Sequence, residues 1–166
     1  MNNLNILQFS FFLILPFYTI NNSFAQTNDT IYWSHSVQLK RSDFNLKIAN
    51  ECAKHNALAM CFNSIKTKGF IENKLPNYNI KVYFLKSKSC ARDTSSLLYL
   101  KHEQLHFDIS ELYARKMRRT ISIIRHFHFS SFKLYQHFLK RINSKCDLYQ
   151  DRYDSETDHS LRINNQ

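Results

Sequence analysis

The longest regular pattern in the chain is a stretch without glycine or proline from residue 97 to about residue 125. Apolar residues recur in it at spacings of three, four or multiples of them, as in a helix with one side packed on a core. These residues are Leu98, Leu105, Ile109, Leu112, Met117, Ile121 and Ile124. Asp93-Thr94-Ser95-Ser96, just upstream, supplies residues that cap helix N-termini. The sequence therefore predicts a long helix with one buried side.

A second stretch of helical periodicity follows a polar break near Ser130-Ser131. Its apolar and aromatic residues again lie mostly three or four apart. They are Tyr135, Phe138, Leu139, Ile142, Cys146, Tyr149 and Tyr153. This pattern predicts a second long helix packed on the first. It ends in residues 153–160, where acidic side chains and a histidine crowd together.

Shorter β-like runs precede the two helices, at residues 30–33 and in the region of residues 57–65. Residues 80–85 alternate in the period of a half-buried strand. Between these runs, residues 70–78 contain Pro76 and predict a turn. The whole pattern predicts an α+β fold in which a small N-terminal sheet is followed by two long helices.

The N-terminus has the pattern of a signal peptide. Residues 6–20 are almost entirely apolar, and Ser23 and Ala25 place small residues where a signal peptidase cuts. Cleavage would leave residues 26–166 as one exported domain, periplasmic or extracellular. The pattern departs from that of a signal peptide in one respect, because no lysine or arginine precedes the apolar run. The alternative is an uncleaved membrane anchor. No other stretch approaches the length of a bilayer span, so no stable membrane span is expected after cleavage.

Export changes the interpretation of the four cysteines, because an oxidising compartment would pair them. Four cysteines allow three connectivities. The favoured pairing joins Cys52 to Cys61 and Cys90 to Cys146, and free structural thiols are the alternative. No Cys-x-x-Cys spacing is present, so a cysteine zinc site or a redox motif is not expected.

Composition and charge describe a globular, basic protein. Hydrophobic residues make up 43% of the chain, and about 140 mature residues suffice for one core. The net charge of +10 favours anionic partners such as cell-envelope polymers. No nucleic-acid partner is expected, because neither an RNA-binding aromatic motif nor a basic arm is visible.

The chemistry is carried by His102-Glu103-Gln104-Leu105-His106, a His-Glu-x-x-His pattern within the first predicted helix. Residues four apart share a helix face, so His102 and His106 can hold one Zn²⁺ while Glu103 reaches its bound water as general base. Two histidines four apart can also form a simple polar stripe. The long, rigid helix around the motif favours the metal site.

A tetrahedral zinc ion with two histidines and a water lacks one protein ligand. His159 is the preferred candidate, and Glu156 and Asp154 are the alternatives, since all three lie in the segment that follows the second helical stripe. Glu111 is rejected as a ligand because it lies on the opposite side of the helix. It is predicted instead to hydrogen-bond behind the ligands or to stabilise the fold. Tyr153 can donate a hydrogen bond to an oxyanion or serve in packing. Three other histidines are predicted to lie at the surface or in helix packing: His126, His128 and His137.

Two sequence blocks resemble a known family, the bacterial domain of unknown function 922, described as secreted zinc-dependent proteases of the zincin type. The first block is His102-Glu103-Gln104-Leu105-His106-Phe107-Asp108-Ile109, continuing through Glu111-Leu112-Tyr113-Ala114-Arg115. The second is Tyr153-Asp154-Ser155-Glu156-Thr157-Asp158-His159, and an early Trp33 with Asp43-Phe44 also fits the start of that family. The resemblance implies a zincin-like domain, metal on His102 and His106, and Glu103 as catalytic base.

The expected function is therefore that of an exported zinc-dependent hydrolase, a metalloprotease acting on a peptide or protein. In that case the strand at residues 80–85 can pair with an extended substrate, or it can be an ordinary sheet strand. The alternative function is a non-catalytic envelope-binding protein that keeps a zincin-like fold and uses its positive charge. Hydrolysis of a non-peptide amide is a third possibility.

Overall fold

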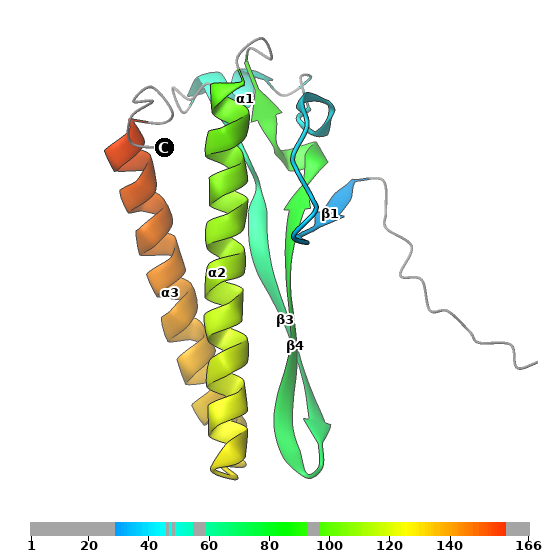
Figure 1. Ribbon diagram of the computed structural model, residues 1–166, viewed down its shortest axis with the longest axis vertical. Coiled ribbons are helices and arrows are strands. Elements are labelled where there is room, and N and C mark those ends of the chain that lie inside the picture. Colours follow the sequence, from blue (N-terminus) through cyan, green and yellow to red (C-terminus); the bar gives the residue numbers. More distant parts are fainter. Residues whose placement is uncertain (1–28, 46, 48, 55–58, 93–96, 159–166) are drawn as a thin grey trace, which may run out of the picture.

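The computed structural model of the protein describes residues 29–45, 47, 49–54, 59–92 and 97–158 (Figure 1). Its strands are β1 (Thr30–Tyr32), β2 (Ala59–Met60), β3 (Asn63–Glu72), β4 (Leu75–Leu85) and β5 (Cys90–Ala91). Its α-helices are α1 (Ala49–Lys54), α2 (Leu98–His126) and α3 (Phe132–Thr157), with short 3-10 helices at Arg41–Asp43 and Lys86–Lys88. One antiparallel sheet has the order β1-β4-β3, and β2 pairs with β5. The predicted α+β arrangement of a small sheet and two long helices is confirmed.

The predicted signal peptide, residues 1–25, and the predicted helix-capping residues 93–96 lie outside the described residues. Among the helices that are described, none combines the length and the hydropathy needed to cross a bilayer.

The hairpin of β3 and β4 corrects the predicted turn at residues 70–78. Both strands run on through this segment, and only Asn73 and Lys74 turn, with φ of 51° and 64°. Asparagine tolerates this left-handed conformation, which a two-residue hairpin of matching twist requires. Pro76 fits in β4 because β4 has β3 alone as a neighbour at that point, where an absent N–H is tolerated.

Strand β4 supplies the sheet's contribution to the core. Ile80, Val82 and Phe84 are all buried, which confirms the alternation seen in the sequence. The Phe84 ring packs against Phe107 of α2 with centroids 6.1 Å apart, and against Phe44 at 5.5 Å. The sheet therefore fixes one side of α2 through aromatic contacts.

Helix α2 extends from Leu98 to His126, close to the predicted bounds. Of the predicted apolar stripe, Ile109, Met117, Ile121 and Ile124 are buried. Leu112 is 45% exposed, so its place in the stripe was wrong. The adjacent Tyr113 and Ala114 are buried instead, because α2 is covered by the sheet and by α3 over a wider face than a single stripe.

Helix α3 returns antiparallel to α2 after a short connection (Figure 1). Tyr135, Leu139 and Cys146 are buried as predicted, whereas Tyr149 is 46% exposed. The helix continues to Thr157, so most of the acidic segment belongs to its last turns. The antiparallel arrangement places the end of α3 beside the beginning of α2, where the His-Glu-x-x-His motif lies.

The disulfide bond differs from the predicted pairing. Cys52 is bonded to Cys90, while Cys61 and Cys146 are free thiols. The predicted bonds Cys52–Cys61 and Cys90–Cys146 were therefore wrong. Helix α1 packs beside β5, which brings Cys52 next to Cys90, whereas Cys61 turns toward α2.

We expect the double variant Cys52→Ala, Cys90→Ala to lose about 4 kcal/mol of unfolding free energy, because the bond closes a loop with a sequence separation of 38 residues. Urea denaturation with and without a reducing agent measures the loss. The reducing agent should destabilise the parent and leave the double variant unchanged. A stabilising bond between Cys61 and Cys146 would instead leave the double variant sensitive to reduction.

Candidate metal centre

His102 and His106 lie one turn apart near the start of α2 and point to a common spot. Both are buried, with exposed fractions of 3% and 9%. Their Nε2 atoms lie 3.0 Å apart. The i, i+4 spacing of the motif thus brings two imidazole nitrogens together, as the sequence predicts.

Asp154 completes the cluster from the last turns of α3. Its Oδ1 atom lies 3.1 Å from His102 Nε2 and 2.8 Å from His106 Nε2. Residues from two helices that are about fifty positions apart in sequence therefore meet in one group that could hold a metal ion. In the described part of the chain, this group is the one whose ligand atoms lie within 4.8 Å of one another.

The other two candidates for the third ligand are not part of this cluster of described residues. Glu156 is exposed and forms an ion pair with Arg152 at 2.7 Å, so it lies outside the cluster. His159, the preferred candidate from the sequence, lies outside the described residues. Asp154, an alternative in the sequence analysis, is the candidate that reaches both histidines.

The hydrogen bonds of Gln150 determine the tautomer of His106. The Gln150 amide Nε2 donates to the His106 carbonyl oxygen at 3.0 Å and to Ser110 Oγ at 3.1 Å. Gln150 Oε1 is therefore an acceptor, and His106 Nδ1–H donates to it. With the proton on Nδ1, the neutral ring presents its Nε2 lone pair to the cluster.

Thr157 determines the tautomer of His102 in the same way. Its hydroxyl donates to the Tyr153 carbonyl oxygen at 2.7 Å, so its oxygen is free to accept from His102 Nδ1–H at 3.4 Å. Both histidines thus have the tautomer that metal-bound histidines use, with the outer nitrogen held by a hydrogen-bond acceptor.

The donor set fits a divalent cation. Two neutral imidazole nitrogens and a carboxylate oxygen are all acceptors, and they lie within 3.1 Å of one another, which is unfavourable unless a positive charge lies between them. Zinc bonds of about 2.0–2.2 Å in tetrahedral geometry would separate such atoms by roughly 3.3 Å, so small adjustments suffice. Nitrogen and carboxylate donors suit zinc and also other transition metals.

A proton competes with a metal for the same atoms. Burial lowers the pKa of His106, but the hydrogen bond to Asp154 and the charges of Glu103 and Asp154 outweigh this effect and raise the pKa above its ordinary value. Burial raises the pKa of Asp154, and its hydrogen bonds to His102 and His106 reverse this effect and bring the pKa well below its usual range. Asp154 is thus an ionised carboxylate, which can pair with a metal ion or with a protonated histidine.

Glu103 is held beside the two histidines by the chain that precedes β3. Its Oε2 atom accepts a hydrogen bond from the Cys61 backbone N–H at 2.9 Å, and the side chain is buried. Burial, together with the charge of Glu103, raises the pKa of the Cys61 thiol well above its ordinary value. Cys61 therefore positions Glu103 through its backbone while its thiol stays protonated.

A cleft of about 440 Å³ opens over these side chains. Its walls are residues 59–61 and 63–65, around the start of β3, and the last half of α3. Helix α2 contributes His102, Glu103 and His106. Asn63 and Ser110 join the wall to α2 through a hydrogen bond from Ser110 Oγ to Asn63 Oδ1. The cleft is large enough to admit an extended segment of a substrate.

The remaining predicted residues lie as follows. Tyr153 stacks on the His102 ring with centroids 4.8 Å apart, and its hydroxyl is buried without a hydrogen-bond partner in the part of the chain described. Burial raises its pKa to about 12, so it stays a neutral phenol. Glu111 pairs with Arg115 at 3.0 Å and with Arg118, away from the cluster. His126, His128 and His137 are exposed.

The strand that borders the cleft is β3, whereas the sequence pointed to residues 80–85. Those residues belong to β4, the central strand, which pairs with β1 at one edge and with β3 at the other. Residues 80–84 pair with β3, and residues 83–85 pair with β1, so most of this segment is engaged within the sheet.

Comparison of the chain with models of protein families, with curated proteins and with solved structures finds no match in any of the three.

Sequence reasoning did not identify Gln150 and Thr157 as partners of the motif histidines. The signal was present, because residues 150, 154 and 157 are spaced four and three apart and share one face of α3. Their role becomes visible only when α3 is placed antiparallel to α2.

Replacing Gln150 by leucine is expected to lower the zinc affinity by about 10–100-fold, because His106 loses the acceptor that fixes its tautomer. Competition with a chromogenic chelator measures this affinity. Gln150→Glu keeps an acceptor at this position and should restore most of it. Gln136→Leu, at an exposed position of the same helix, is the matched control, and an equal loss there would contradict the assignment.

Proposed function

We propose that the protein is a zinc-dependent hydrolase, acting on peptide bonds, with a zincin-like arrangement of its motif helix. One observation supports this most strongly: His102, His106 and Asp154 converge through three acceptor atoms, and the neighbouring hydrogen bonds keep both imidazole lone pairs directed at one point. Glu103 is buried in the same cleft beside the two histidines, where a metal-activated water would need a base.

Bound zinc would supply Lewis acidity, which lowers the pKa of a coordinated water from about 15.7 toward about 7 and polarises a substrate carbonyl. Glu103 lies within the same cleft and acts as the general base that takes the proton of the attacking water. It then passes that proton to the departing amine. The Cys61 N–H holds the carboxylate in place through both steps. Tyr153 keeps the His102 ring in its orientation by stacking.

The test begins with metal content and stability. Purified protein freed of metal with a chelator should bind one zinc ion per chain. Zinc at about 100 times its dissociation constant should raise the unfolding free energy by about 2.7 kcal/mol. Hydrolysis of a labelled, unfolded protein substrate should be lost with the chelator and return with zinc. A protein that binds no zinc would contradict the proposal.

The alternative of a non-catalytic envelope-binding protein gives a different result. It would bind zinc or anionic polymers, with salt-sensitive affinity, and turn over neither peptide nor amide substrates. Activity on small amides with none on peptides would assign the third possibility. Measuring both substrate classes with the same zinc-loaded sample separates these outcomes.

We also propose that the protein is exported, as its N-terminal pattern predicts. The Cys52–Cys90 bond supports this, since such bonds persist in oxidising compartments. Mass spectrometry of protein recovered from outside the cytoplasm should find a chain that begins at Gln26. A full-length chain in the cytoplasm would contradict export.

A further inference from the structure

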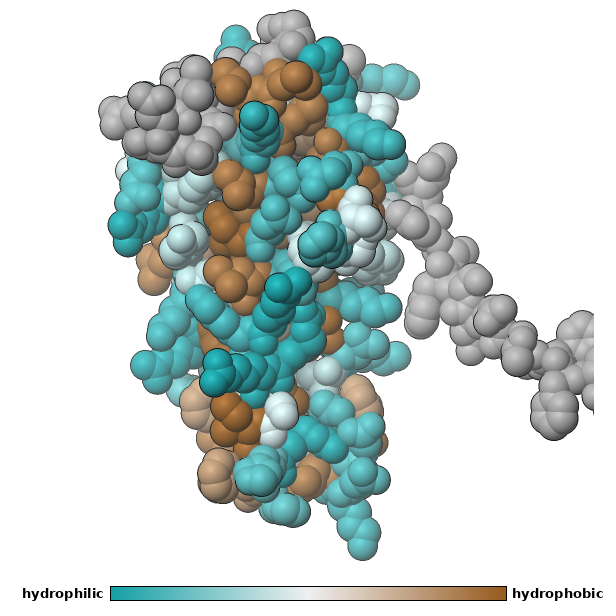
Figure 2. Space-filling view, viewed as in Figure 1, coloured by the Kyte–Doolittle hydropathy of each residue, from teal (hydrophilic) through white to brown (hydrophobic). Residues whose placement is uncertain are grey.

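The end of the molecule opposite the candidate metal centre carries hydrophobic side chains on its surface (Figure 2). This end consists of the β3–β4 hairpin turn and the connection between α2 and α3 (Figure 1). Six of its large hydrophobic side chains are 38–65% exposed. They form what we call the aromatic end: Phe70, Ile71, Ile123, Phe127, Phe129 and Phe132.

The two parts of the aromatic end are fastened together. Arg125 of α2 donates to the carbonyl oxygens of Pro76 and Leu75 at 2.9 and 3.3 Å, and pairs with Glu72 at 2.8 Å. The connection is fixed in turn, since the buried Tyr135 hydroxyl donates to the Phe129 carbonyl oxygen at 2.8 Å. The apolar side chains are thus presented from a fixed base.

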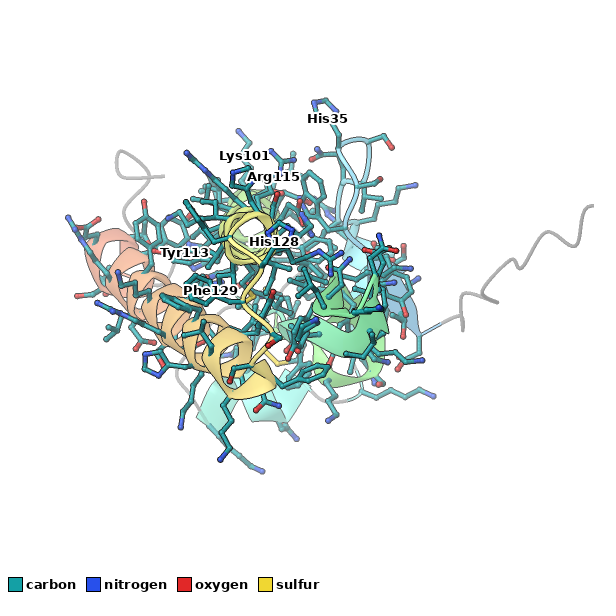
Figure 3. The ribbon with its side chains drawn as sticks, turned by 90° about the horizontal axis from the view of Figure 1, so that it is seen from below. His35, Lys101, Tyr113, Arg115, His128 and Phe129 are labelled. Atoms are coloured by element: carbon teal, nitrogen blue, oxygen red, sulfur yellow. A yellow bond between two sulfur atoms is a disulfide. The ribbon has the colours of Figure 1, made fainter. Side chains whose placement is uncertain are left out.

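The charge at this end is of one sign. Residues 68–79 and 119–140 contain six lysines and arginines and a single acidic residue, Glu72, which is paired with Arg125. Lys68, Lys74 and Lys133 are exposed near the turns. Figure 3 views the molecule from this end and shows His128 and Phe129 just beyond the last turn of α2. The exposed apolar side chains of the aromatic end therefore lie among cationic side chains.

We propose that the aromatic end binds a membrane surface that contains anionic lipid. Aromatic and aliphatic side chains gain free energy at the boundary of head groups and acyl chains, and lysine and arginine are attracted to the negative surface potential. Either contribution alone is weak, and this end carries both. A second copy of the chain is a poorer occupant, because pairing two such ends would bring like charges together.

Membrane binding by the aromatic end does not depend on the metal centre, but it would fix where the metal centre lies relative to the membrane. His106 and His126 are twenty residues apart on α2, so the cleft would stand roughly 30 Å above the lipid surface. A substrate near the membrane, rather than within it, would reach the cleft.

The test uses the full chain and a tryptophan reporter. The chain has one tryptophan, Trp33, which serves as the common background. In the variant Phe127→Trp, vesicles with brominated acyl chains and one quarter phosphatidylglycerol should quench the new fluorescence. The matched variant Leu148→Trp, at a position of α3 that is 68% exposed, should not be quenched. This comparison separates insertion of the aromatic end from any membrane affinity of residues 1–28.

A second variant tests the contribution of the positive charges to membrane binding. Reversing Lys74 and Lys133 with Lys74→Glu and Lys133→Glu should weaken binding to these vesicles at least about tenfold, and pure phosphatidylcholine vesicles should bind weakly throughout. Quenching at position 148 but not at 127, or binding unaffected by the charge reversal, would overturn the proposal. A third result would also overturn the proposal. In it, the parent protein does not bind vesicles but associates with itself, and the double variant Phe127→Ser, Phe129→Ser does not self-associate.

Discussion

Replacing Glu103 by glutamine is expected to reduce hydrolysis by about 10²–10⁴-fold while leaving zinc affinity nearly unchanged. Glutamine has the same shape, and its carbonyl oxygen can still accept the hydrogen bond from the Cys61 N–H, so the fold and the cleft are retained. What is lost is the ability to take a proton. Single-turnover rates with zinc-loaded variant and parent measure the effect.

Two controls make this result specific to position 103. Glu156→Gln removes a carboxylate from the exposed side of α3 and should leave the rate unchanged. Circular dichroism and zinc titration show whether the Glu103→Gln variant keeps its fold and its metal site. If that variant cleaved as fast as the parent, Glu103 would not be the base, and the hydrolase proposal would lose its main chemical argument.

The parts of the fold that the sequence predicts well are those that local periodicity determines. The helical spacing identified α2 and α3, and the alternation in residues 80–85 identified the buried face of β4. The histidine pair belongs to the same class, because four residues of helix bring two side chains together whatever the rest of the chain does. These features need no knowledge of tertiary structure.

The parts that were predicted wrongly depend on how distant segments meet. The disulfide joins Cys52 and Cys90 because α1 packs beside β5, a contact that neither spacing nor composition encodes. The turn at residues 70–78 was placed by Pro76, whereas the local preference of Asn73 for a left-handed conformation decides where the hairpin turns. Proline is disfavoured in a strand that has neighbours on both sides. At Pro76, β4 has a neighbour on one side, so the strand can continue through the proline.

The third donor belongs to this second class as well. In the sequence, Asp154, Glu156 and His159 all lie near the end of a predicted helix, and His159 was preferred. The sequence does not show which of the three faces the motif. Only the antiparallel packing of α3 on α2 selects a face of α3. Residues 150, 154 and 157 lie on that face, and each contacts a motif histidine.

Replacing Asp154 by alanine is accordingly expected to lower zinc affinity by more than about 100-fold. Loss of a hydrogen-bond partner behind a ligand costs about 10–100-fold, and loss of a direct donor should cost more. The measurement is chelator competition at neutral pH, with thermal unfolding in the presence and absence of zinc as a second readout. The zinc-dependent gain in stability should disappear with the affinity.

Two matched variants decide which side chain is the donor. Glu156→Ala should bind zinc like the parent, because this carboxylate pairs with Arg152 at the surface. His159→Ala should also retain the site if Asp154 completes it. If His159→Ala lost zinc while Asp154→Ala kept it, the carboxylate would serve only as an ion-pair partner of protonated His106. In that case the cluster would be a buried salt bridge in the absence of metal, and α3 would supply its ligand from beyond its last turn.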